Sequence, residues 1–537
     1  MRIWPIFGLM LIVVTVGFFW LPRDDQAVIW RTLRFCLSAA MIAIPLSVWA
    51  GRCLNQPTWA SNALLFCFIA LAVVPPYIYV SCWDSAFGKL GWLTSAQGQI
   101  LQPLLSGWWA AVWVHAIGLI PQFGLLFFWA MAAARTFEEQ AQLDLPQSTI
   151  FFHITLRRLL PLTLLCVLWA VIVCSREIAV TDLYQIGTLA EQIYLGYSLG
   201  QVNALAANWS ASEIQAAGSI GFSIRALQLL FLTAVSLLFF RTLTGFSKDS
   251  SMTMESLGRR TGPSSKVSLR CLVGSMAIML LLVAVPMFNL IYQAGTSVRV
   301  IDGQPTPLWA VSHLMRAIVK AASEFRNAFL WSTLIALASS ALLILSTAVL
   351  CFGAKKNRLA WWVLILLTSL FAGLSGPDIG SGLTALCGQS QNRFLLWLYD
   401  CTIGPAVIAN LIFCWPLATM VVWFAISQTA NDQIENAQLD RIGLIHRVFE
   451  FGFRQHWQQF LGIWMLIVAI CFSELSASQM VLPPGIETVP QVTLGKLHAG
   501  VNETTAALSL LTIGLVVAIA MTAWIIIKRG IPFQRKG

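Results

Sequence analysis

The sequence predicts an all-α polytopic membrane protein, and three features of its composition carry that prediction. Hydrophobic residues make up 58% of the 537 residues and charged residues only 10%, whereas soluble globular proteins contain about 45–50% and about 25% of these classes. Aromatic residues reach 12%, with 23 Trp, which is typical of aromatic belts at the two membrane surfaces. The net charge of +10 is explained by basic residues in cytoplasmic loops. We therefore expect a lipid bilayer, and no nucleic acid, as a partner of this chain.

About twelve apolar runs are long enough to cross a bilayer, for which a helix needs about 20 residues. The first six lie near residues 3–21, 32–50, 60–80, 104–134, 159–180 and 219–241, and the second six near 269–291, 327–352, 358–376, 403–426, 459–481 and 505–528. The first run ends without a cleavage site of small residues, so we expect it to be retained. Most of the 33 Lys and Arg residues fall on one side of the membrane if the N-terminus is inside, which predicts that both termini are cytoplasmic. The longer outer loops are then expected near residues 81–103, 181–218, 292–326, 377–402 and 482–504.

The runs divide into two halves of six spans each. Residues 1–241 form the first half and residues 269–537 the second, and residues 242–268, rich in Ser, Thr, Gly and Arg, form a predicted cytoplasmic linker. Short motifs recur in the same order about 300 residues apart. The recurring pairs are Trp30-Arg31-Thr32-Leu33 with Trp331-Ser332-Thr333-Leu334, Ala141-Gln142-Leu143-Asp144 with Ala437-Gln438-Leu439-Asp440, Ser175-Arg176-Glu177 with Ser473-Glu474, and Thr188 with Thr488. Since each half has an even number of spans, we expect two parallel repeats with a pathway between them.

Charged residues late in the fifth and eleventh runs are candidates for the translocation path. They are Arg176, Glu177, Ser473 and Glu474. An ionisable group inside a span costs about 2.5–3.5 kcal/mol on insertion scales, so it faces the bundle interior or water. Two interpretations remain open, a lining of the path near its outer end and a structural hydrogen bond or ion pair between helices. His115 has no carboxylate at ligand spacing in the sequence, and we expect a core or interfacial histidine there.

Two cytoplasmic segments, one after the fourth run and one after the tenth, have the same plan. The first reads EEQAQLDLPQSTIFFHITLRRLLP from Glu138 to Pro161, and the second reads IENAQLDRIGLIHRVFEFGFRQHW from Ile434 to Trp457. Each begins with acidic and Ala residues that favour a short helix and continues as an amphipathic stretch. A solvated loop would explain either segment alone, but the repeated pair favours a docking element.

These segments resemble the EAA loops of ABC importer permeases, whose pattern is roughly EAAxxDGA followed by Leu-Pro. Phe472-Ser473-Glu474-Leu475-Ser476-Ala477-Ser478 resembles the RELSAS stretch of iron(III)-type permeases, and Pro483-Pro484-Gly485 follows it. The resemblance implies two fused MetI-like domains, with cores at about 28–241 and about 325–528. Leu145 and Arg441 stand where the family has Gly, and the second loop lacks the closing Pro.

The resemblance also implies a function, the permease subunit of an ATP-binding-cassette importer in a bacterial inner membrane. The implied partners are a cytoplasmic ABC ATPase dimer and a periplasmic solute-binding protein. The residues that the resemblance assigns to ATPase coupling are Glu138, Glu139, Ala141, Asp144, Glu435, Ala437 and Asp440. Ferric iron is the leading substrate, with thiamine, a polyamine or an oxyanion as alternatives.

The sequence contains no G-x-x-x-x-G-K-[ST] loop, which is the motif that cradles nucleotide phosphates. We therefore expect no catalytic residues, cofactor or resident metal in this chain, and ATP hydrolysis by a partner subunit. The alternative from another class is a secondary transporter driven by an ion gradient, with Glu177 and Glu474 as coupling carboxylates. The paired cytoplasmic loops argue against it.

Overall fold

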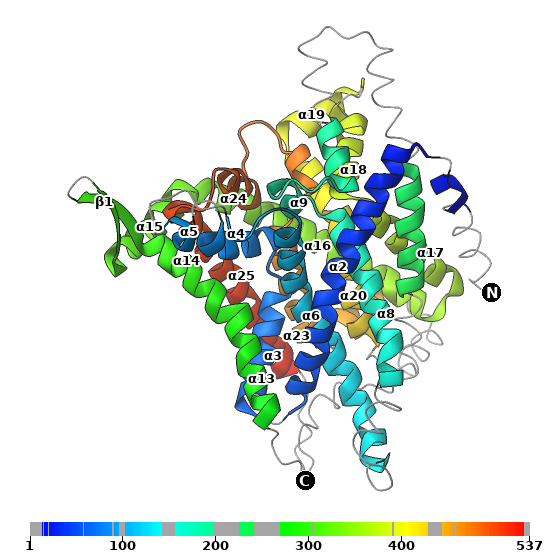
Figure 1. Ribbon diagram of the computed structural model, residues 1–537. Coiled ribbons are helices and arrows are strands. Elements are labelled where there is room, and N and C mark those ends of the chain that lie inside the picture. The colour runs from blue at the N-terminus through cyan, green and yellow to red at the C-terminus, as the bar shows by residue number, and fades with distance from the viewer. Residues whose placement is uncertain are drawn as a thin grey trace.

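Figure 1 shows the computed structural model of the chain, a bundle of long helices. The structure describes residues 13, 15–19, 21–56, 58–88, 91–95, 103–141, 156–197, 225–240, 269–301, 304–388, 391–427, 443–454 and 457–530.

The elements of the first half are all helices in the part that the structure describes. They are α2 (Arg23–Leu54), α3 (Trp59–Leu71), α4 (Pro76–Phe87), α5 (Trp92–Ser95), α6 (Gly107–Ala141), α8 (Leu156–Arg176), α9 (Ala179–Leu183), a short helix over residues 189–197 and a helix Arg225–Phe240.

The elements of the second half are helices and one hairpin in the part that the structure describes. Its elements are α13 (Leu269–Met279), a π-helical turn (Leu280–Ala284), α14 (Val285–Gly295), β1 (Thr296–Ile301), β2 (Gln304–Trp309), α15 (Val311–Glu324), α16 (Arg326–Lys356), α17 (Arg358–Gly373), α18 (Gly376–Leu383), a π turn (Thr384–Gly388), α19 (Arg393–Cys401), α20 (Gly404–Ser427), α22 (Leu444–Arg447), a π turn (Val448–Arg454), α23 (Trp457–Phe472), a 3-10 turn (Ser478–Met480), α24 (Val489–His498) and α25 (Glu503–Gly530).

Within the described residues, seven helices are long and apolar enough to cross a membrane, or up to nine if each of two bent helix pairs is one span. The chain is therefore an all-α polytopic membrane protein, as the composition predicts. Two further predicted spans are shorter apolar helices, Arg225–Phe240 and Trp457–Phe472. The first predicted run lies mostly outside the described residues, so the expected number of twelve stays a prediction.

Two predicted spans are broken in the middle instead of running straight. Trp59–Leu71 and Pro76–Thr94 meet at 110°, and Arg358–Gly373 and Gly376–Gly388 meet at 95°. Both breaks precede a proline, which lacks an N–H and keeps the residue before it out of the helical region. In the second break, Ser375 then starts α18 as a capping box with Asp378, so the chain re-enters a helix immediately after the bend.

The hairpin is the departure from the all-α prediction. Residues 292–326 are expected to be an outer loop, but β1 and β2 pair in antiparallel register there, with Thr296 opposite Trp309, and α15 follows. These are the two strands in the part of the chain that the structure describes.

One helix of each half also packs against the other half. α25, at the end of the second half, packs against α3 and α4 of the first half, and Ser509 shares a 2.7 Å hydrogen bond with Ser81. In the other direction, Gly373 of α17 lies against the Leu229 carbonyl and the Thr233 side chain of the helix Arg225–Phe240. Each half therefore completes its packing with a helix from the other.

Candidate translocation site between the halves

The internal repeat is visible as a pair of matching buried hydrogen bonds. The Leu189 amide donates to the Thr32 hydroxyl at 2.9 Å, and the Val489 amide donates to the Ser332 hydroxyl at 2.8 Å. Each bond joins one of the two long helices α2 and α16 to the first turn of a short helix, and each spans 157 residues. The two bonds make Thr32 equivalent to Ser332, 300 residues later, whereas the sequence motif pairs Trp30 with Trp331, 301 residues later. Both equivalent positions carry a hydroxyl that accepts the bond.

Glu177 and Glu474 occupy equivalent places at the ends of α8 and α23. The amide of Ala179 donates to Glu177 Oε1 at 2.6 Å, and the amide of Ala477 donates to Glu474 Oε1 at 2.6 Å. Both residues are buried, at 8% and 7% exposure. Each carboxylate therefore accepts a hydrogen bond from the turn that follows its own helix. Of the two interpretations that the sequence leaves open, this geometry gives both carboxylates a structural contact, and a lining of the solute path stays a prediction.

Glu177 also has a partner that the sequence does not indicate. His115 Nε2, on α6, lies 3.4 Å from Glu177 Oε2, and His115 is only 2% exposed. The expectation of a core histidine is therefore confirmed, and the structure adds a carboxylate beside it that stands at no ligand spacing in the sequence. Helix packing, and not sequence spacing, brings α6 and the end of α8 together.

Arg176 connects the first half to the second. Its Nε donates to the Leu374 carbonyl at 2.8 Å and its Nη2 donates to the Phe413 carbonyl at 3.0 Å, and its guanidinium lies 4.3 Å from the centre of the Phe413 ring. Leu374 is the residue at which α17 breaks, so its carbonyl is not used inside that helix. The Arg176 charge also interacts with the Glu474 carboxylate. Ser473, by contrast, donates to the Ala469 carbonyl within α23.

A cavity of about 470 Å³ lies between the halves, beyond the ends of α8 and α23. We call this end of the bundle the outer end. The first half contributes Asp182, Tyr194 and Tyr197, and the second contributes Tyr399, Gln479, Met480, Gln491, Leu494, Gly495 and His498. The amide nitrogen of Gln479 and the amide oxygen of Gln491 are buried without a hydrogen-bond partner. The cavity therefore offers polar groups that a solute or water can satisfy.

An ion pair crosses this cavity from one half to the other. His498 Nε2, on α24, lies 3.2 Å from Asp182 Oδ2, on α9, and the two side chains are 46% and 21% exposed. The hydrogen bond to Asp182 raises the pKa of His498 above its usual range. Nearby, burial and the Asp182 charge raise the pKa of Glu191 to about 7. Protonation of these groups therefore changes the charge at the outer end near neutral pH.

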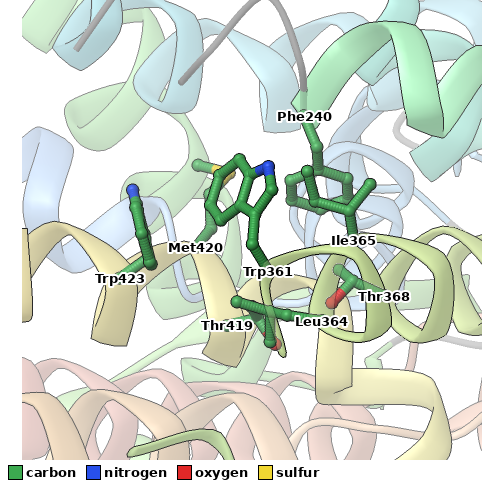
Figure 2. A pocket seen from close by; sticks show the side chains of 8 residues that line it. All are labelled: Phe240, Trp361, Leu364, Ile365, Thr368, Thr419, Met420 and Trp423. Carbon is green, nitrogen blue, oxygen red and sulfur yellow. The ribbon is translucent and has the colours of Figure 1, made fainter. Parts of the chain in front are cut away.

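A second cavity is a packing crevice and no solute site. Figure 2 shows the apolar side chains that surround it, with Trp361 and Ile365 of α17, Met420 and Trp423 of α20, and Phe240 of the helix Arg225–Phe240. Its volume is only about 20 Å³, which holds little more than one water molecule.

The residues assigned to ATPase coupling are mostly outside the described part of the chain. Glu138, Glu139 and Ala141 lie in the last turns of α6, which continues as a helix beyond the apolar span Gly107–Met131. The remaining four, Asp144, Glu435, Ala437 and Asp440, lie outside the described residues. The coupling assignment therefore stays a prediction.

The described residues contain no group of three or more His, Cys, Asp or Glu side chains that could hold a metal ion. All 12 cysteines are free thiols, and only Cys401 is exposed.

No protein family, curated protein or solved structure matches this chain. Function is therefore inferred from three features of the molecule: the internal repeat, the Arg176 contacts between the halves and the outer cavity.

Proposed function

We propose that this chain is the permease subunit of an ATP-binding-cassette importer in a bacterial inner membrane, with both termini cytoplasmic. The observation that carries the proposal is the pair of matching hydrogen bonds that the Thr32 and Ser332 hydroxyls accept. They relate two polytopic halves, and a cavity of about 470 Å³ lies between these halves. A solute would enter that cavity from a periplasmic solute-binding protein and pass between the halves. An ATPase dimer would bind the two cytoplasmic loops and move the halves.

Arg176 supports a coupled movement of the halves, because it holds the carbonyl exposed by the break in α17. A displacement of α8 relative to α17 and α20 breaks these contacts together. Ferric iron is the proposed solute, and thiamine, a polyamine or an oxyanion are the alternatives that uptake measurements must separate.

The first experiment is purification of the intact chain from its native membrane. We expect an ATPase to purify with it, and we expect ATP turnover by that complex and none by the chain alone. ATP turnover by the isolated chain would contradict the proposal.

The second experiment tests coupling with charge reversals in the cytoplasmic loops. Glu139→Lys and Glu435→Lys should weaken ATPase binding and solute uptake at normal protein levels, and the Glu139 change should be the more damaging. Glu503→Lys, an exposed position at the start of α25, is the matched control and should leave both unchanged. Labelled ferric iron, thiamine, a polyamine and an oxyanion are offered in turn. Normal uptake with both loop charges reversed would favour an ion-driven secondary transporter.

A further inference from the structure

Helix α15 has an exposed apolar stripe that no described element covers. Val311, Met315 and Val319 follow one another at intervals of four residues, and their exposed fractions are 59%, 54% and 64%. Ala317 and Ala321 lie on another face and are buried, where α15 packs against α14 and α25. The helix thus has one face against protein and a second apolar face beside it.

The third face of α15 is polar and cationic. Ser312, Arg316, Lys320 and Ser323 are all exposed. Since successive residues of a helix are turned by about 100°, Arg316 and Lys320 are turned by about 100° and about 140° from Met315. Ser312 and Ser323 lie between these cations and the stripe. The stripe therefore lies between the protein face and the charged face, as in helices that lie flat at a membrane surface.

The neighbouring elements fix the depth of α15. It follows the candidate span Leu269–Gly295 and precedes the candidate span Arg326–Lys355, so it joins two spans at one side of the membrane. At the end of α15, Glu324 Oε1 lies 3.9 Å from Lys496 Nζ on α24. Other residues of α24, among them His498, line the outer cavity. Figure 1 shows α15 and the hairpin projecting from the bundle beside the end of α14.

Trp309 marks the same depth. Its indole covers Gly295, the last residue of α14, and 44% of its surface is exposed, next to Leu308 at 40%. Tryptophan side chains at the end of a span are typical of the interface between hydrocarbon and headgroups.

We propose that α15 and the β1–β2 hairpin form an interfacial lipid-binding element. Val311, Met315 and Val319 enter the acyl-chain region of the outer leaflet, and Arg316 and Lys320 contact lipid phosphates. The bilayer is the occupant that this placement favours, because the two spans hold the stripe at the level of the leaflet and the adjacent cations complement anionic headgroups. The proposal does not depend on what the chain transports.

The test uses an environment-sensitive fluorophore on single cysteines of the full-length chain. Cys401, the exposed native thiol, is replaced by Ser, and the label is placed at Val319→Cys or, as the matched control on the charged face, at Lys320→Cys. The chain is reconstituted into vesicles of phosphatidylethanolamine and phosphatidylglycerol. We expect blue-shifted emission at position 319, quenched by lipids with a nitroxide on the acyl chain and protected from aqueous iodide. Position 320 should show the reverse.

A second variant tests the charged face. With the label at position 319, the double substitution Arg316→Gln and Lys320→Gln should reduce acyl-chain quenching in vesicles that contain phosphatidylglycerol and leave it unchanged in vesicles of phosphatidylcholine alone. Equal quenching of positions 319 and 320 by iodide would overturn the proposal. Protection of position 319 only after addition of a periplasmic protein would also overturn it, in favour of a protein-docking surface.

Discussion

Substitution of Arg176 by Met removes the polar bridge between the two halves and keeps most of the side-chain volume. The bridge consists of hydrogen bonds to the Leu374 and Phe413 carbonyls, the contact with the Phe413 ring and the interaction with Glu474. Because Arg176 is 7% exposed, water cannot easily replace these contacts. The variant leaves the Leu374 carbonyl, at the end of α17, without its donor.

The expected cost follows from these contacts. A hydrogen bond with a charged partner contributes about 1.5–3 kcal/mol, and a contact of a cation with an aromatic ring contributes about 0.5–2 kcal/mol. The variant also avoids the cost of burying a guanidinium, which offsets part of this sum. We expect the free energy of unfolding to fall by about 3 kcal/mol, at the lower end of the range for loss of one partner from a buried charged network.

The assay is SDS-induced unfolding of the purified chain in mixed micelles, followed by tryptophan fluorescence. Arg454→Met is the matched control, because Arg454 is 72% exposed and pairs with Glu450 at the surface, and we expect it to cost less than about 1 kcal/mol. Arg176→Lys should fall between the two, since it keeps the charge and loses the planar fork. Equal unfolding free energies for Arg176→Met and Arg454→Met would refute the reasoning.

Three further predictions concern the other contacts of the site. His498→Gln should remove a pH-dependent stabilisation of about 0.2–1 kcal/mol; because the pKa of His498 is raised, that stabilisation is complete below about pH 6.5 and is lost as the pH rises through the raised pKa, so unfolding is measured on both sides of this range. Ser332→Ala should cost about 1–3 kcal/mol, since it leaves the buried Val489 amide without an acceptor, and Ser332→Thr should restore it, as Thr does in the first half. Gly376→Ala should cost about 1–3 kcal/mol by overpacking, because a Cβ at this position meets the Ser476 backbone, just after α23. Gly382→Ala is the control, because a Cβ there has open space, and it should be neutral in the same unfolding assay.

The positions of most spans follow from hydropathy alone, because a lipid-facing helix must be apolar over its whole length. α2, α6, α8, α16, α20 and α25 all lie on predicted runs. The same measure does not detect a change of direction, so it treats the broken pairs as single spans. Pro75-Pro76 and Gly376-Pro377 stand in the sequence at the two bends, and their backbone restrictions would have indicated them.

The hairpin also had a sequence signature. Asp302-Gly303 stands between two short segments, and Asp-Gly between strands is a strong indication of a two-residue turn. The exposed stripe of α15 likewise follows a four-residue interval within the expected outer loop, which is the pattern of an amphipathic helix.

The sequence indicated individual residues of the site but not the contacts between them. Recurrence within the chain identified Glu177 and Glu474 as equivalent, and the structure places both at the ends of equivalent helices. The contact of His115 with Glu177, and those of Arg176 with Leu374 and Phe413, join segments far apart in the sequence. Such pairs depend on how the helices pack, and no local pattern reports them.

The packing of helices from one half against the other has a consequence for how the chain is made. The helix Arg225–Phe240 leaves the ribosome before α17, against which it packs, and α3 and α4 are in place well before α25 covers them. The first half therefore lacks the contacts of α3 and α4 with α25 until this last helix is synthesised. An insertase or the lipid itself must shield these faces meanwhile, and a chain truncated before α25 would present them to the cell's membrane proteases.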